Sequence, residues 1–487
     1  MENSVNNGKK RRLYPCDQED TTNNGSSLGG GQVDRLSSLP NFLLGNILSR
    51  LPLYLAATTS ILSRRWRGLW SRFATRLILR YCQFSRGFFT PYSGGRHKFL
   101  TIVDHILRQI TSPEITNFQL QLYCDDDDRE FCSSLLQSWF RQVCSQNAKK
   151  IEVKVEFDSN LSLIPLPICI FDCHSLIKLE FRGNFRFNLP VNRIITLPNL
   201  KKLEIYLPIL NTTFIRTIIT LLKSCPILEK LTLILNWPYD EFVMDICAPN
   251  LKCFKASMSG TSRRSRFMID APRLKDIVIG SSLACYNFVN HPGRLQKVNI
   301  SFRHSTSKGK IDSVSVLSDF IQGISSISSL ELYDDLTIFN CFRYMSAKVR
   351  PVFHNLTRLI LTKYTKEIEN ESVLIPVCLL RKLKYIEISE LTGDESDVRF
   401  VKYISNNANV LEQLHVMVDN LDNFEDDDGE KDQLWREYMF CRTLFNLSMR
   451  SSACEIEFEG HYIIKATTPN LDVGPSIVNY FGRQLSE

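Results

Sequence analysis

The phrase LPNLKKLEIY at residues 197–206 decides the fold, because the chain repeats it with variations over most of its length. Apolar residues alternate with charged ones in its second half, a pattern that predicts a short β-strand with one buried face. The residues expected to point inward are Leu200, Leu203 and Ile205. Those expected to point outward are Lys202, Glu204 and Tyr206.

Related phrases follow at the spacing of leucine-rich repeats. Aligned on the first leucine, they lie at residues 176, 200, 228, 251, 274 and 295, so the steps are 24, 28, 23, 23 and 21 residues. Repeats of this class are about 20–29 residues long, and the phrase returns at residues 330, 356, 383 and 411. Stretches of helical periodicity lie between phrases, as at residues 212–224 and 397–408. The pattern predicts a curved solenoid with parallel strands on its concave face and helices on its convex face.

A segment of different character, VDRLSSLPNFLLGNILSRLPLYLAATTSILSRRWRGLW, occupies residues 33–70. Its apolar residues recur at helical spacing around Pro52, which predicts three short helices. The first carries a stripe of Leu43, Leu44, Ile47, Leu48 and Leu51. The third would begin at a Ser63 cap, with Arg64, Arg65 and Arg67 pointing away from a face of Trp66, Leu69, Trp70 and Phe73. So short a unit buries little surface, and we expect it to need a partner.

Composition limits the remaining possibilities. Residues 1–32 are rich in Asn, Gly and Ser, which predicts a disordered tail, and the KKRR cluster at 9–12 fits either nuclear import or a charged tail. A net charge of +7 over 487 residues is too dilute to indicate nucleic-acid binding, and the acidic runs at 125–128 and 425–428 are expected to be solvated loops. Because no long apolar run or signal-peptide core is present, we expect neither membrane insertion nor secretion.

No arrangement typical of catalysis is found in the sequence. There is no Gly-rich phosphate loop after a strand, no nucleophile or metalloprotease motif and no paired histidines, so we expect no catalytic residues, metal or cofactor. The chain has 15 cysteines but no CxxC pair. The spacing nearest to a metal site is Cys169, Cys173 and His174, without a second pair nearby. We therefore expect reduced thiols that pack mostly as small hydrophobic side chains.

Residues 34–70 resemble the F-box, the adaptor-binding motif of substrate receptors in cullin-RING ubiquitin ligases. The resemblance rests on DRLSSLP (34–40), ILSRLP (47–52) and TSILSRRWRGLW (59–70), which stand in the order and spacing of that family. The sequence departs from the family pattern in three places. Asn41 stands where Asp is usual, Tyr54 and Leu55 replace a usual Lys-Asp pair, and Ala57 sits where Val is frequent.

The rest of the chain resembles the plant F-box class with leucine-rich repeats and a C-terminal FBD region. Its landmarks are PVFHNLTRLIL (351–361), NNANVLEQLHVMV (406–418) and MRSSACEIEF (449–458). The resemblance implies an α/β chain in which a small three-helix F-box precedes the solenoid. The expected divisions are a disordered tail over 1–32, the F-box over 33–80, the leucine-rich-repeat solenoid over 81–350, C-terminal repeats with the FBD-like region over 351–460 and a C-terminal tail over 461–487.

By resemblance, the chain would be a non-catalytic substrate-recognition subunit of an SCF-type E3 ubiquitin ligase, located in the nucleus and/or cytoplasm. The F-box would bind a Skp-type adaptor, and through it cullin and RING subunits, while the repeats would hold an unknown target protein. No membrane, nucleic acid or cofactor is implied. The family positions that form the helical core or the adaptor contact match Leu36, Leu39, Pro40, Ile47, Leu48, Leu51, Pro52, Leu62, Trp66 and Trp70.

Two other interpretations stay open on the sequence. One is a leucine-rich interaction scaffold whose degenerate F-box no longer recruits a ligase. The other is a nucleic-acid-binding protein that uses the KKRR cluster and the arginines of residues 64–67, although this leaves the apolar face of the same helix unexplained. In the solenoid, the candidate target contacts are outward-facing strand residues, for which a simple solvated surface is the favoured explanation: Lys202, Glu204, Tyr206, Lys230 and Thr232.

Overall fold

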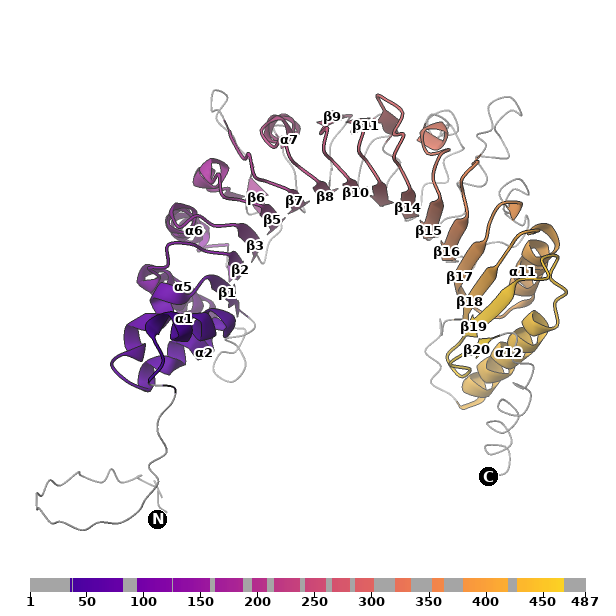
Figure 1. Cartoon of the computed structure of the whole chain (residues 1–487), viewed down its shortest axis with the longest axis horizontal. Helices are drawn as coiled ribbons and strands as arrows, with labels where there is room; N and C mark the ends of the chain where they lie inside the picture. Colours follow the sequence, from indigo (N-terminus) through magenta and orange to yellow (C-terminus); the bar gives the residue numbers. More distant parts are fainter. Residues whose placement is uncertain are drawn as a thin grey trace, which may run out of the picture.

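The computed structural model places the chain in an open arch (Figure 1). Strands line the inner side of the arch, most helices lie on its outer side, and α1 and α2 stand at the N-terminal foot. The expected tail over residues 1–32 and most of 461–487 fall outside the described residues. The structure describes residues 36, 38–81, 94–124, 126–157, 163–186, 195–207, 214–236, 241–259, 265–280, 285–301, 320–333, 353–362, 380–418 and 427–467.

One continuous sheet of 15 strands, counted over the described residues, runs along the inner side of the arch. Neighbouring strands pair in parallel, except for the antiparallel pair at the C-terminal edge. The predicted curved solenoid with a concave parallel sheet is confirmed. In sheet order, the strands are β1 (Arg76–Arg80), β2 (Asn117–Cys124), β3 (Lys150–Phe157), β5 (Lys178–Gly183), β7 (Lys202–Leu207), β8 (Lys230–Asn236), β10 (Cys253–Ser259), β12 (Asp276–Gly280), β14 (Lys297–Ser301), β15 (Ser329–Tyr333), β16 (Arg358–Thr362), β17 (Tyr385–Leu391), β18 (Gln413–Val418), β19 (Glu455–Glu459) and β20 (Ala466–Thr467).

The strand register aligns the same position of each phrase across the sheet. Leu203 of β7 lies beside Leu179 of β5, and both side chains are fully buried, as the alternation predicts. The register also corrects one alignment made from the sequence. Leu330 pairs with Val298, which is a strand residue, so the anchoring residue of that repeat is the buried Ile327, three positions earlier.

The asparagine that precedes the anchoring leucine ties repeats together. The Asn199 side chain donates a hydrogen bond to the carbonyl oxygen of His174 at 2.9 Å, and Asn250 donates to that of Pro226 at 2.9 Å. In both cases the acceptor belongs to the preceding repeat. Because turn carbonyls have no strand partner, such a bond satisfies a group that the sheet leaves open. The PNL part of the phrase therefore has a structural role.

The outer side of the arch is helical at both ends. In the described part of the chain its helices include α5 (Gly94–Gln109), α6 (Arg129–Ser145), η3 (Ile168–Asp172), α7 (Phe214–Lys223) and α11 (Glu395–Asn407). None of the helices within the described ranges is both long and apolar enough to span a bilayer.

The middle of the outer side is a second sheet, where the prediction of helices is wrong. Strands β9 (Val243–Cys247), β11 (Arg266–Asp270) and β13 (Cys285–Phe288) pair in parallel there. The repeats in this region step by only 23, 23 and 21 residues, which leaves little chain for a helix. Residues 243–247 also alternate between exposed and buried positions, the period of a strand. A further short pair joins β4 (Ile164–Pro165) to β6 (Phe185–Arg186).

The N-terminal helices are fused to the solenoid by a strand that the sequence did not predict. They are α1 (Asn41–Arg50), α2 (Leu53–Thr58), η1 (Thr59–Ile61), η2 (Trp66–Gly68) and α3 (Leu69–Phe73), and β1 follows directly. β1 is the first strand of the large sheet and pairs with β2. The expected Ser63 side-chain cap is absent from η2, where only the Ser63 carbonyl oxygen accepts a bond from the Trp66 N–H at 3.1 Å.

The C-terminal foot contains a long helix, α12 (Asp427–Phe445), beside α11 (Figure 1). The acidic run at 425–428 was expected to be a loop, and this is wrong for its last two residues, which begin α12. The described part of the other acidic run, residues 126–128, lies in a turn before α6, as expected.

Candidate functional site

The N-terminal helices form a small core around two tryptophans. Leu44 and Leu48 of α1 are buried with Trp66 of η2 and Trp70 of α3, each at most 6% exposed. The four-residue spacing of the tryptophans puts both on one side of the turn that they share, as predicted. Gly45 is also buried, because α1 and α3 approach closely there. Of the predicted site residues, Leu48, Trp66 and Trp70 therefore belong to the core.

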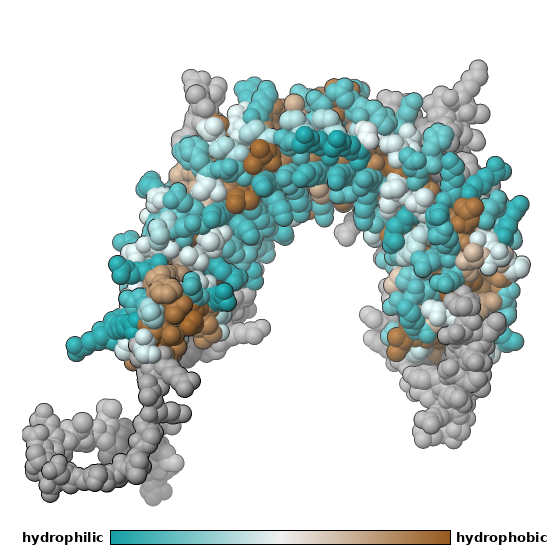
Figure 2. Space-filling view, in the orientation of Figure 1, coloured by the Kyte–Doolittle hydropathy of each residue, from teal (hydrophilic) through white to brown (hydrophobic). Residues whose placement is uncertain are grey.

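Apolar side chains cover the outer surface of the same helices. This surface, called the apolar face below, accounts for eight of the fifteen large hydrophobic residues that are exposed in the described chain. Figure 2 shows hydrophobic residues gathered at the N-terminal foot of the arch, where α1 and α2 lie. The apolar face consists of Leu36, Phe42, Leu43, Ile47, Tyr54, Leu55, Ile61 and Leu62.

The structure divides the predicted site residues into those buried in the helical core and those at least partly exposed on its surface. Helical periodicity in the sequence could not make this distinction. Outside the core, Leu39 and Leu51 are half-buried. The others are exposed: Leu36, Pro40, Ile47, Pro52 and Leu62. A small partner element can bind such a face through a few large anchors. Exposure is greatest at Ile61, which is 87% exposed, and its neighbour Leu62 is 58% exposed.

Five members of the apolar face were not among the predicted site residues: Phe42, Leu43, Tyr54, Leu55 and Ile61. Tyr54 and Leu55 were noted only as a departure from a usual charged pair. At 58% and 40% exposed, they add large apolar side chains to the surface of α2, where the usual pair would be charged. A sequence signal for Tyr54 and Leu55 does exist. The helix α2 has more large apolar residues than so short a helix can bury against the core.

One of the three arginines in residues 64–67, which are predicted to point away from the tryptophan face, has a structural role. Arg65 donates from Nε to Oδ1 of Asn41 at 2.9 Å and from Nη2 to the carbonyl oxygen of Leu39. These bonds hold the start of α1 against the turn before η2. Arg64 and Arg67 are exposed, as predicted.

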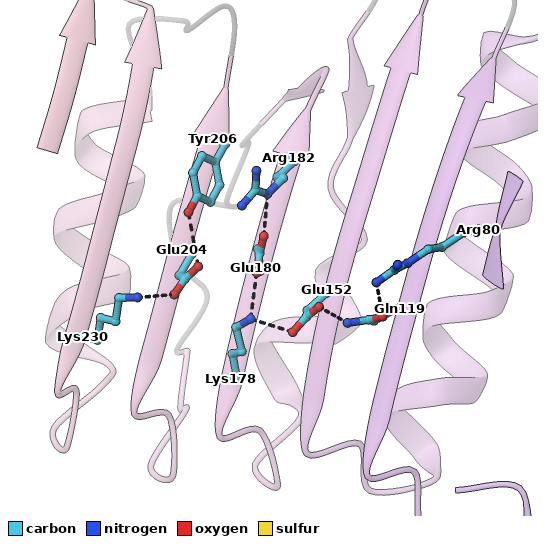
Figure 3. A network of polar contacts seen from close by, with 9 residues as sticks. All are labelled: Arg80, Gln119, Glu152, Lys178, Glu180, Arg182, Glu204, Tyr206 and Lys230. Carbon is cyan, nitrogen blue, oxygen red and sulfur yellow. Dashed lines mark hydrogen bonds and ion pairs between the residues drawn. The ribbon is translucent and has the colours of Figure 1, made fainter. Parts of the chain in front are cut away.

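The concave face of the solenoid carries a row of glutamates in register. Glu152 of β3 lies beside Glu180 of β5, which lies beside Glu204 of β7. Neighbouring strands are about 4.8 Å apart, so like charges in one row would repel one another. Figure 3 shows how basic and polar side chains from the adjacent rows intervene.

Each glutamate of this row is bound by a cation. Nζ of Lys178 lies 2.6 Å from Oε1 of Glu152 and 2.8 Å from Oε2 of Glu180, while Nε of Arg182 lies 2.6 Å from Oε1 of Glu180. Burial by itself raises the pKa of Glu180, but the bonds from Lys178 and Arg182 outweigh it and leave that pKa below the ordinary value. Nζ of Lys230 pairs with Oε1 of Glu204 at 2.9 Å.

Two of the candidate target contacts are not a simple solvated surface. Glu204 is only 7% exposed and Thr232 only 1%. They occupy the middle of their strands, where the curvature of the sheet crowds the inner face. Tyr206 is half-buried, since its ring lies 3.8 Å from the Arg182 guanidinium and its hydroxyl donates to Glu204 at 3.3 Å. Lys202 remains exposed.

Three cysteines meet where η3 packs on the end of α6. Sγ of Cys173 lies 3.6 Å from the carbonyl oxygen of Ala148, and hydrogen bonding with Cys144 lowers the pKa of Cys173 to about 7. The sequence spacing pointed to Cys169 and Cys173 but missed Cys144, which belongs to another repeat; His174 is exposed. The cysteines in the described chain are free and mostly buried or half-buried, as predicted. No group of His, Cys, Asp or Glu in those same ranges is arranged to hold a metal ion.

Comparison with known proteins agrees with this architecture. A model of the F-box domain matches residues 36–76, one described as "FBD-associated F-box protein At5g56370, LRR repeats" matches 136–301, and an FBD model matches 371–416. The chain is 26% identical to F-box/LRR-repeat protein 13 of Arabidopsis thaliana over 443 residues, 82% of this chain and 93% of that protein. It is 24% identical to F-box/FBD/LRR-repeat protein At1g78750 of the same plant over 465 residues, 88% of this chain and 97% of the relative.

Along this chain the F-box match comes first, the repeat match second and the FBD match third. The F-box match covers the helices that present the apolar face, and the repeat match covers the strands that bear the glutamate row. The chain is a plant F-box/leucine-rich-repeat protein of the FBD type.

Proposed function

We propose that the chain is the substrate-recognition subunit of an SCF-type E3 ubiquitin ligase. The F-box binds a Skp-type adaptor, which links it to cullin and RING subunits, and the solenoid holds a target protein for ubiquitination. The observation that carries the proposal is the apolar face, because eight large hydrophobic side chains on so small a helical unit need a partner. F-box/LRR proteins in general are substrate adaptors of such ligases, which supports the same assignment.

In this proposal the chain contributes position and no covalent step. An adaptor bound at the N-terminal foot and a target bound along the arch become parts of one complex, which raises the effective concentration of the target near the ubiquitin-loading enzyme. The fusion of β1 to the large sheet supports this role, because a rigid connection limits the distances that the target samples. A location in the nucleus and/or cytoplasm is part of the proposal.

The competing function is a scaffold whose F-box has lost its adaptor. The presence of Tyr54 and Leu55 in the apolar face favours the ligase subunit, since an unused docking surface has no reason to keep exposed apolar residues. The test is to purify the tagged full-length chain from plant cells and to probe for the Skp-type adaptor and cullin. The proposal predicts both in the purified complex, and a scaffold predicts neither. Proteins that accumulate when the chain is deleted are the candidate targets.

A further inference from the structure

The inner face of the arch is divided by charge. In the strands β1 to β10, nine cations face inward against four carboxylates, whereas in β12 to β19 two cations face six carboxylates. Figure 2 shows hydrophilic residues along the inner rim. The nine cations are Arg76, Arg80, Lys150, Lys154, Lys178, Arg182, Lys202, Lys230 and Lys255, and the four carboxylates are Glu152, Glu156, Glu180 and Glu204. The later strands contribute Lys297 and Arg358 against Asp276, Glu331, Glu387, Glu455, Glu457 and Glu459.

Four lysines of the basic half stand in one register row, called the lysine row below. The row is Lys150, Lys178, Lys202 and Lys230 in the consecutive strands β3, β5, β7 and β8. Two of them, Lys178 and Lys230, pair with the glutamate row. Lys150 and Lys202 are exposed and have no ion-pair partner within the ranges that the structure describes. Because neighbours in the row are about 4.8 Å apart, their like charges repel one another and favour an anionic partner.

Two carboxylates of this region, Glu180 and Glu204, lie deeper than the exposed cations that bind them, whereas Glu152 and Lys178 are about equally exposed at 24% and 21%. The side chains of Glu180 and Glu204 are 11% and 9% exposed, whereas those of Arg182 and Lys230 are 45% and 39% exposed. Beside Glu180 and Glu204, a partner that approaches the concave face therefore meets the Arg182 guanidinium and the Lys230 ammonium group before it meets the carboxylates. The glutamates therefore fix the positions of these cations, while the positive groups remain the outermost charges.

The same strands are poorly suited to nucleic acid. Single-stranded nucleic acid is usually bound by stacking its bases on exposed aromatic rings. The Tyr206 ring is covered by Arg182 at 3.8 Å, and Lys154 lies 5.8 Å from the centre of the Tyr123 ring. Glu156 is also partly exposed beside Lys154, where it would repel a phosphate backbone. The charge and the covered rings together favour an acidic polypeptide.

We propose that the lysine row binds an acidic segment of the target protein, an inference that rests on the proposed function of the solenoid. The row crosses four strands and spans about 14 Å at 4.8 Å per step. An extended chain covers that span with about four or five residues. The acidic half of the arch repels such a segment and so confines it to β3–β8.

The test uses full-length protein and a fluorescein-labelled 12-residue peptide of alternating Asp and Ser, with fluorescence anisotropy as the readout. A Lys-Ser peptide of equal length and a 12-nucleotide oligo-U RNA are the comparison probes. The variant K150E/K202E reverses the two lysines that make no ion pair, so folding is spared. The control, K223E/K402E, makes the same change in net charge at exposed lysines on the outer helices α7 and α11.

The expected result is that the wild type prefers the Asp-Ser peptide, that K150E/K202E weakens its binding about tenfold or more, and that K223E/K402E changes it less than about twofold. The proposal is overturned if the wild type does not bind the Asp-Ser peptide, if it binds the RNA more tightly, or if both variants lose affinity equally through net charge. Co-purification of the adaptor with K150E/K202E separates the two proposals, because the F-box does not depend on the lysine row. Loss of peptide binding with the adaptor retained supports the lysine row.

Discussion

Gly45 provides a sharp test of how the F-box helices pack. A Cβ atom added there would lie 2.3 Å from Cδ1 and 2.6 Å from Cγ of Phe73, well inside van der Waals contact. The ring, which is half-buried, would have to move by more than about 1 Å, or α1 would have to separate from α3. The G45A variant therefore opposes two effects of known size.

Replacing glycine by alanine inside a helix normally stabilises it by about 1 kcal/mol. Forcing an extra methyl group into a packed contact normally costs about 1–3 kcal/mol. The half-buried Phe73 ring packs against Gly45, and rotating it into solvent would expose its buried surface. We therefore expect the cost of the extra methyl group to exceed the gain in helix stability. The expected net loss in the free energy of unfolding of the helical unit is about 1 kcal/mol.

The assay is hydrogen exchange by mass spectrometry on full-length protein, read on peptides from residues 41–73. A loss of about 1 kcal/mol speeds exchange in α1 and α3 about fivefold. The matched control is G68A, because a Cβ at Gly68 meets nothing within 4 Å. The double variant G45A/F73L should lose less than the sum of the single variants. The packing argument is refuted if G45A exchanges no faster than G68A.

Three further predictions concern the solenoid. The pKa of Glu180 is lowered in the folded protein, so its stabilising contribution is present above the unfolded pKa of about 4.3 and is lost as the pH falls. In urea unfolding, E180Q should be about 1 kcal/mol less stable than wild type at pH 7, and the difference should shrink as the pH falls below about 4.3; a difference that does not change with pH contradicts a stabilising role for the ion pairs of Glu180. Asp397 is fully buried and accepts bonds from the N–H groups of Thr392 and Gly393 at 2.9 and 3.0 Å, so D397A should cost about 2–3 kcal/mol and increase proteolysis at residues 390–396. Equal protease resistance of D397A and wild type would show that these bonds do not hold the turn before α11. Trp139 donates to Asp104 at 3.0 Å, so W139F should lower the urea midpoint by an amount equivalent to about 1–2 kcal/mol, and an unchanged midpoint would show that the bond adds nothing.

The repeats could be predicted from the sequence because each position of the phrase has the same structural role in every repeat. Each anchoring leucine fills the space between consecutive strands, so its type and spacing are tightly limited. The second outer sheet was missed because β9, β11 and β13 are short and separated, and a strand of five residues has little periodic signal. Strand β1 was missed because it is also only five residues long, and because its sequence RLILR comes soon after a helix.

The site was predictable in position but not in detail. Apolar periodicity in residues 41–51 identifies a helix, yet it cannot tell Leu44, which α3 covers, from Leu43, which stays exposed. That distinction depends on how wide a strip of α1 the neighbouring helix covers. Glu204 was expected in solvent because charged residues usually lie there. Only the register explains a nearly buried glutamate, because it places Lys230 opposite Lys202 and so within diagonal ion-pair reach of Glu204.

The most direct test of the account is the affinity of the full-length chain for a purified Skp-type adaptor, measured by titration calorimetry. The variant I61D/L62D places charges in the most exposed part of the apolar face, where neither side chain supports the core. The control, I464D, alters an isoleucine at the C-terminal foot that is 78% exposed, between the values for Ile61 and Leu62. The account predicts wild-type binding, a loss of at least about 30-fold in I61D/L62D and a change below about twofold in I464D. Equal affinity of wild type and I61D/L62D, or no binding by wild type, would contradict it.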